Sequence, residues 1–176
     1  MQEIRKGIRE DIAKIQKIYD HILSEEENGN ASTGWIRGVY PTEETALAAW
    51  KAGELFVMAQ EDAVVAAARI NQTQVPEYQN ALWQYRDAPP EQIMVLHTLA
   101  VDPAFAGRGY GTKFVGFYEH YALENHCPYL RMDTNERNTA ARSLYRRLGY
   151  REAGIVPCDF NGIPGVRLVC LEKLLR

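Results

Sequence analysis

The sequence is poor in cysteine, in net charge and in long apolar runs. Its three cysteines, Cys127, Cys158 and Cys170, are widely spaced, and no two of them form a CxxC pair. Such spacing argues against a disulfide framework or a thiolate zinc site, and it suits a reducing cytoplasm. The formal net charge is only −3 and no block of Lys or Arg stands out, so nucleic acid is a poor candidate partner.

No stretch of the chain approaches the length of a membrane span, and residues 1–15 are too charged for a signal peptide. We therefore expect a cytoplasmic protein without a membrane partner. Neither HExxH nor GxSxG occurs, which disfavours a metalloprotease-type zinc site and an acyl-enzyme route, and no metal site is expected. With 176 residues, 46% of them hydrophobic, the chain fits one domain over residues 1–176.

Hydrophobic periodicity predicts an alternation of strands and helices. The apolar run 93–101 is typical of a central strand buried on both faces, and Asp11 and Asn138 are expected to cap helices. The expected order is a strand near residue 4, helices at 11–22 and 42–53, strands at 55–60, 63–72 and 93–101, a helix at 110–125, a strand at 129–134, a helix at 139–149 and a closing strand at 165–175. This order predicts an α/β fold (α+β by a looser definition), with a mixed central sheet flanked by helices on both faces.

A glycine-rich segment, "AFAGRGYGTKF" at residues 104–114, follows the central strand and precedes a helix. Glycine reaches positive φ without steric cost, which suits a tight turn. Bare amides at a helix N-terminus also suit an anion such as a phosphate. The spacing GxGxG fits neither the Rossmann pattern GxGxxG nor the P-loop pattern GxxxxGKS/T, which leaves acyl-CoA as the third nucleotide hypothesis.

Two motifs together make the sequence resemble the GNAT superfamily of acyl-CoA-dependent N-acetyltransferases. These are "LHTLAVDPAFAGRGYGTKF" and "NERNTAARSLYRRLGY", which lie in the family's usual order within residues 93–151. Gly109 and Gly111 fill the small positions of the family's phosphate loop, but Ala106 stands where Gln or Arg is usual. The resemblance implies a single GNAT-like domain with its acetyl-CoA-binding core at about residues 93–151. It also implies acetyl-CoA as co-substrate, with no metal.

The resemblance implies roles for individual residues. Main-chain amides of the glycine segment hold the pyrophosphate, and the end of the central strand and an asparagine contact the pantetheine arm. The implied cofactor-binding residues are Leu99, Ala100, Val101, Gly107, Arg108, Gly109, Tyr110, Gly111, Thr112 and Asn138. Tyr145 is implied to lie near the thioester sulfur as general acid. From the residues alone, Tyr145 also fits a core tyrosine and Asn138 a simple N-cap.

The implied activity is transfer of an acetyl group to a primary amine by direct attack in a ternary complex. An alkyl ammonium has a pKa near ~10.4, so the acceptor must lose a proton before it attacks. His97 on the central strand is the first candidate base, because imidazole titrates near ~6.5. A structural, hydrogen-bonded histidine and a water chain are the alternatives. Thr98 alternates to the opposite face, so only one of the two points at the cofactor unless the strand bulges.

Two irregular segments, residues 24–41 and 71–92, are expected on the acceptor side by analogy with the family. Their aromatic residues Trp35, Tyr40 and Trp83 are candidates for an apolar or cation-binding wall. The sequence does not distinguish a small-molecule amine from a peptide amine, and it leaves a homodimer open. The alternative to an enzyme is a non-catalytic CoA-binding sensor or structural protein with the same fold.

Overall fold

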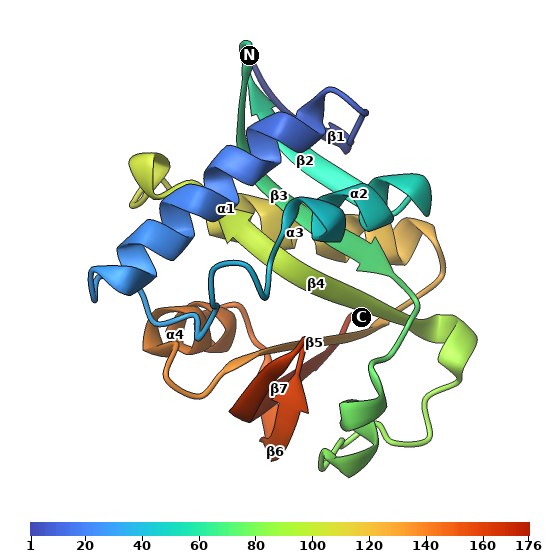
Figure 1. Ribbon diagram of the computed structural model, residues 1–176. Helices are drawn as coiled ribbons and strands as arrows, with labels where there is room; N and C mark the ends of the chain where they lie inside the picture. Colours follow the sequence, from blue (N-terminus) through green and yellow to red (C-terminus); the bar gives the residue numbers. More distant parts are fainter.

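The computed structural model describes all 176 residues and contains one seven-stranded sheet in the order β1-β2-β3-β4-β5-β7-β6 (Figure 1). Only β4 and β5 pair in parallel, and every other neighbouring pair is antiparallel. The strands are β1 (Gln2–Lys6), β2 (Leu55–Gln60), β3 (Ala63–Asn71), β4 (Ile93–Val101), β5 (Tyr129–Asn135), β6 (Arg151–Phe160) and β7 (Ile163–Leu174). The helices are α1 (Asp11–Glu27), α2 (Glu43–Lys51), α3 (Tyr110–Glu124) and α4 (Thr139–Arg147), with short 3₁₀ helices η1 (Pro76–Asn80), η2 (Pro90–Gln92) and η3 (Pro103–Phe105). The predicted mixed α/β sheet is confirmed.

Helices cover both faces of the sheet, as the sequence predicts. Figure 1 shows α1 and α2 in front of the N-terminal strands and α3 behind them. The apolar side of α1 packs with α2 on one face of β2 and β3, whereas α3 and α4 bury residues on the other face. A third hydrophobic cluster lies where η1 packs on β6 and β7. The long connection at residues 72–92 therefore replaces a helix over the C-terminal half of the sheet.

The start of α1 differs from the prediction. Asp11 is the first residue of the helix and Glu10 is its N-cap, without a side-chain cap. The Asp11 carboxylate instead accepts hydrogen bonds from Arg5 at 2.8 Å and from the Ile8 amide at 2.9 Å. Because Asp11 is only 1% exposed, its charge is used to tie β1 to α1 rather than to cap the helix.

The single closing strand of the prediction is a hairpin, β6 and β7. Asn161 (φ 53°) and Gly162 (φ 79°) form its turn, and an Asn-Gly pair with two positive φ values is typical of a tight hairpin. β6 lies at the sheet edge, contains Pro157 and shifts register twice along β7. Proline and irregular register at an edge strand break the alternation on which strand prediction rests.

The parallel pair β4–β5 has a paired and an unpaired part. Residues 93–96 of β4 pair with 129–132 of β5, and no pairing continues beyond Leu96 and Met132. β4 stays bonded to β3 as far as Val101, and β5 stays bonded to β7 as far as Asn135. The two halves of the sheet therefore part at this point. We call residues 93–96 with 129–132 the closed end, and residues 97–101 with 133–135 the open end.

Candidate active site

A cavity of about 500 Å³ lies where the open end parts. Both strands line it, through His97, Thr98 and Leu99 of β4 and Asp133, Thr134 and Asn135 of β5. Thr98 has φ 53°, and the register of β4 against β3 shifts beside it. This bulge adds one residue to β4, so His97 and Thr98 both reach the cavity instead of alternating away from each other.

The glycine segment joins β4 to α3 in a left-handed conformation. Gly107 has φ 76° and Gly109 has φ 73°, where any other residue is strained, and open space surrounds the position of an added Cβ at each. Gly111 has a different reason to be glycine: a Cβ there would lie 3.3 Å from Leu144, so its absence lets α3 approach α4.

Six successive backbone N–H groups, from Gly107 to Thr112, donate to no group of the protein. The first amide of this region that does so is that of Lys113, which donates to the Gly109 carbonyl at 3.0 Å. Free amides that converge at a helix N-terminus attract an anion, and the helix dipole adds to the attraction. The Arg108 guanidinium lies 5.1 Å from the Phe105 ring and forms no ion pair. The segment therefore fits an anion such as a phosphate group.

Tyr145 extends from α4 into the cavity wall and is 7% exposed. Its hydroxyl makes no hydrogen bond within the protein, unlike that of a satisfied core tyrosine. Burial raises the pKa of Tyr145 above its ordinary value, and the nearby Asp133 raises it further. At neutral pH the hydroxyl is therefore protonated and free to donate to a ligand.

Asn138 is the N-cap of α4, since its side-chain oxygen accepts from the Ala141 amide at 3.2 Å. The predicted cap is confirmed. The side-chain NH₂ group of Asn138 donates to nothing in the protein, so the cap leaves two donor hydrogens for a ligand. Asn138 is not part of the cavity wall itself.

His97 belongs to a polar chain across β3 and β4. Its Nε2 lies 2.7 Å from Asn71 Oδ1, and Asn71 Nδ2 donates to Glu54, which is paired with Arg69. Because the Asn71 amide donates to a carboxylate, its oxygen faces His97, and this network assigns the imidazole proton to Nε2. Burial and then Arg69 lower the pKa of His97 to about 4. The ring is neutral at pH 7 and is a weak base.

Two of the three predicted acceptor-side aromatics line the cavity. Trp35 and Tyr40 come from the segment at residues 24–41, and the Trp35 ring meets Tyr40 edge-on at 6.2 Å. The Tyr40 hydroxyl hydrogen-bonds Thr98, which fixes the loop to the open end. Burial raises the pKa of Tyr40 to about 12, so this wall carries no charge of its own.

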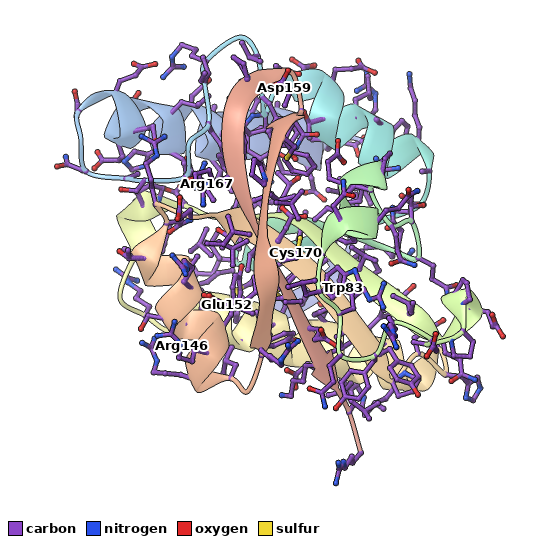
Figure 2. The ribbon with its side chains drawn as sticks, turned by 90° about the horizontal axis from the view of Figure 1, so that it is seen from below. Trp83, Arg146, Glu152, Asp159, Arg167 and Cys170 are labelled. Atoms are coloured by element: carbon purple, nitrogen blue, oxygen red, sulfur yellow. The ribbon has the colours of Figure 1, made fainter.

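The third predicted acceptor-side aromatic, Trp83, is not among the residues that line this cavity. Its indole N–H donates to the Tyr78 carbonyl at 2.8 Å, and its ring lies 4.3 Å from the Arg131 guanidinium. Figure 2 shows Trp83 on the side of the β6–β7 hairpin away from Arg146 and Glu152. Trp83 therefore packs the connection onto the sheet, although Thr73 and Val75 of the same connection do line the cavity.

Sequence reasoning missed Asp133, the acidic residue at the start of the open end of β5. Its Oδ2 accepts from the Tyr78 hydroxyl at 2.6 Å, whereas Oδ1 has no partner in the protein. Burial raises the pKa of Asp133 to about 6, against the lowering effect of the Tyr78 hydrogen bond. A carboxylate inside the apolar strand "YLRMDT" is the signal that could have revealed it.

No group of three or more potential metal ligands gathers in the structure. None of the helices is both long and apolar enough to cross a membrane.

Comparison with known proteins gives a consistent result. The sequence profile of the acetyltransferase (GNAT) family matches residues 15–150. A GNAT-family acetyltransferase from Streptococcus agalactiae has a similar structure, with TM-score 0.82 and 20% identity over 99% of this chain and 96% of that one. The ribosomal-protein-S18-alanine N-acetyltransferase of Escherichia coli has TM-score 0.68 and 18% identity, over 99% and 94% of the two chains.

Two further proteins are informative. The yncA protein of Salmonella typhimurium, solved with its cofactor acetyl-CoA, has TM-score 0.70 and 17% identity over 99% of this chain and 94% of that one. The uncharacterized protein ML0378 of Mycobacterium leprae is 39% identical over 69 residues. That alignment covers 39% of this chain and 18% of the length of the Mycobacterium leprae protein.

Proposed function

Because the chain belongs to the acetyltransferase (GNAT) family, we propose that it transfers an acetyl group from acetyl-CoA to the nitrogen of a primary amine. The amine attacks directly, in a ternary complex with both substrates. The main support is the row of six free amides from Gly107 to Thr112, because the protein itself provides no acceptor for them.

The geometry also offers partners for the rest of the coenzyme. Arg108 has no ion-pair partner and is free to meet a phosphate. Beyond Leu96, the edge of β4 that faces β5 is unpaired, so the main-chain groups between Leu99 and Val101 that point away from β3 are open to the amides of the pantetheine arm. The free NH₂ group of Asn138 lies at the start of α4, the helix that also carries Tyr145.

The chemistry needs one proton donor and one proton acceptor. Bound acetyl-CoA supplies a thioester carbonyl, which is the electrophile. Tyr145 donates its free hydroxyl proton toward the departing sulfur, and burial keeps that proton in place until it is needed. The acceptor ammonium must lose a proton first, and His97, Asp133 and the exposed Glu44 are cavity groups that could take one. Positioning of both substrates in one cavity supplies much of the remaining rate.

The acceptor is a small molecule or the end of a peptide. The cavity wall combines Trp35, Tyr40 and several hydroxyl side chains, which suits an amine on an apolar or mixed carrier. The Escherichia coli relative acts, by its name, on an alanine of ribosomal protein S18, so peptide amines belong in the panel of candidate acceptors.

Ligand-dependent stabilisation tests the first half of this proposal. Acetyl-CoA at ~100 times its Kd is expected to stabilise the fold by about 2.7 kcal/mol, CoA is expected to stabilise it as well, and NAD is expected to have no effect. A response to NAD alone contradicts the proposal.

Release of CoA thiol across a panel of small and peptide amines tests the second half. Turnover with at least one primary amine is the expected result. Tight binding of acetyl-CoA without turnover on any amine favours the alternative, a non-catalytic CoA-binding protein.

A further inference from the structure

Asp133 is the one carboxylate of the inner cavity wall; the other acidic residue of the wall, Glu44, is exposed on α2. Asp133 forms no ion pair, and its one protein hydrogen bond comes from Tyr78 to Oδ2. Oδ1 is left open to the cavity. Asp133 is half-buried, and a partly desolvated carboxylate without a cation costs free energy that a cationic ligand would offset.

The groups around Asp133 are themselves acids. Glu77 and Tyr78 face it from η1, Tyr40 from the segment before α2, and Tyr145 from α4. Cys170, its register partner on β7 (labelled in Figure 2), and Cys158 on β6 also lie near it. The cation of the cavity wall, Arg69, is already paired with Glu54. The buried cation Arg131, two residues before Asp133 on β5, donates to Gln74 and to the Tyr85 carbonyl. The raised pKa values of the tyrosines and cysteines keep these groups neutral, so Asp133 is the charged group that this part of the cavity offers to a cation.

We propose that Asp133 binds the ammonium group of the acceptor and takes its proton before the amine attacks. In this step an N–H bond of the ammonium breaks, its electron pair stays on nitrogen, and an O–H bond forms at Asp133 Oδ1. Tyr78 holds the other oxygen and so fixes the carboxylate plane. This inference rests on the proposed acetyltransferase function, and it specifies the acceptor as an amine that is protonated at neutral pH.

Asp133 suits this role better than His97 on two grounds. An anion attracts the ammonium and accepts its proton, whereas the neutral His97 ring offers no charge. The conjugate acid of His97 is also the stronger acid, with a pKa of about 4 against about 6 for Asp133. Proton transfer from an amine of pKa ~8–10 is less unfavourable to the weaker acid. His97 is then a positioning residue in the Asn71 chain.

The test compares four forms of the full chain with an aliphatic amine that the wild type acetylates: wild type, Asp133→Asn, His97→Gln and Asp87→Asn. Asp87 is a carboxylate in the same connection as Tyr78, with a side chain that is 97% exposed, so it controls for the Asp→Asn change. The measurements are kcat/KM between pH 5.5 and 9, and the Kd for acetyl-CoA.

We expect Asp133→Asn to lower kcat/KM by about 100-fold or more while the acetyl-CoA Kd changes less than about twofold. The wild-type profile falls below about pH 6, and this limb is absent in Asp133→Asn. Asp87→Asn keeps the wild-type profile and stays within about threefold of its kcat/KM, and His97→Gln retains the acidic limb.

Three results overturn the inference. One is a kcat/KM of Asp133→Asn within about threefold of the wild type. Another is a loss of acetyl-CoA affinity in Asp133→Asn that is as large as its loss of kcat/KM, which indicates a structural role for Asp133. The third is loss of the acidic limb in His97→Gln instead of Asp133→Asn. In these cases the acetyltransferase proposal survives. A wild type that acetylates no amine removes both proposals.

Discussion

The two ends of the β4–β5 pair are built from the same two strands but satisfy their polar groups differently. At the closed end Ile93, Met94, Val95 and Leu96 are buried, and the Tyr118 hydroxyl donates to the Met94 carbonyl at 2.7 Å. At the open end the strands part, and the Tyr145 hydroxyl and Asp133 Oδ1 face a cavity without a hydrogen-bond partner in the protein.

This difference indicates that the closed end contributes more to the stability of the fold than the open end. A polar group without a protein partner adds no hydrogen bond to the fold, so the open end contributes less to stability than the closed end in the absence of a ligand. The closed end also makes bonds that hold the connection over the sheet. Glu172 accepts from the Gln84 and Tyr85 amides, and Arg131 donates to the Tyr85 carbonyl.

The largest expected effect comes from removing the free hydroxyl of the open end. We expect Tyr145→Phe to slow acetyl transfer by about 10²-fold or more, because the leaving sulfur loses its proton donor. The free energy of unfolding should change by less than about 0.5 kcal/mol, since that hydroxyl has no protein partner. Thiol release and urea unfolding measure the two quantities, with Tyr121→Phe as a control outside the cavity. Wild-type turnover in Tyr145→Phe would remove the acid role.

Asp133 is expected to make the fold less stable at neutral pH. Its pKa is about 6 in the fold and near 3.8 in the unfolded chain, so the fold binds an extra proton between these values. Stability therefore falls as pH rises through this window, and the cost persists above pH 6. At ~1.4 kcal/mol per pKa unit, Asp133→Asn should stabilise the protein by at most ~3 kcal/mol at pH 7.5, and by nothing near pH 3.5.

Asp11 provides the control of opposite sign for this comparison. Burial raises the pKa of Asp11, but hydrogen bonds from Arg5 and from the Ile8 amide outweigh it, and the net pKa is lowered. Asp11→Asn should therefore destabilise the fold at pH 7.5, and the loss should shrink as pH falls through the carboxyl range. Urea unfolding of both variants at several pH values decides the signs. If Asp133→Asn is less stable than the wild type at pH 7.5, the Asp133 carboxylate does not lower the stability of the fold as proposed.

The sequence predicts the closed end well, because local patterns determine it. The apolar run of β4, the helical spacing of α3 and the cap at Asn138 each follow from neighbouring residues. The β6–β7 hairpin was missed because Pro157 and two register shifts disturb the alternation in β6. The Asn161-Gly162 turn was nevertheless visible in the sequence.

The open end depends on contacts between distant residues, which no single segment reveals. The glycine motif indicates a phosphate loop, but only the fold shows that its amides lack other acceptors. Asp133 can be recognised as a site residue only when the structure shows that β5 separates from β4. Trp83 and Trp35 are both aromatic residues in irregular segments, and their sequence context does not tell which of them faces the cavity.

At the closed end, the matched tyrosine should behave in the opposite way to Tyr145. Tyr118→Phe leaves two buried carbonyls, those of Met94 and Arg131, without their hydroxyl donor. We expect a loss of about 1–2 kcal/mol in the free energy of unfolding, with turnover unchanged below the transition. Urea unfolding measures the stability of Tyr118→Phe, and thiol release measures its turnover. A turnover loss in Tyr118→Phe that equals that of Tyr145→Phe would break the distinction between the two ends.

A substitution in the glycine segment separates backbone strain from ligand binding. Gly109→Ala places a Cβ at φ 73° in open space, so about 1 kcal/mol of strain is the whole stability cost. Gly29→Ala, at φ 78° and also in open space, carries the same strain outside the row of free amides. Calorimetry should show acetyl-CoA affinity reduced about tenfold in Gly109→Ala and unchanged in Gly29→Ala. Equal affinities in the two variants would mean that the diphosphate does not approach the main chain at Gly109.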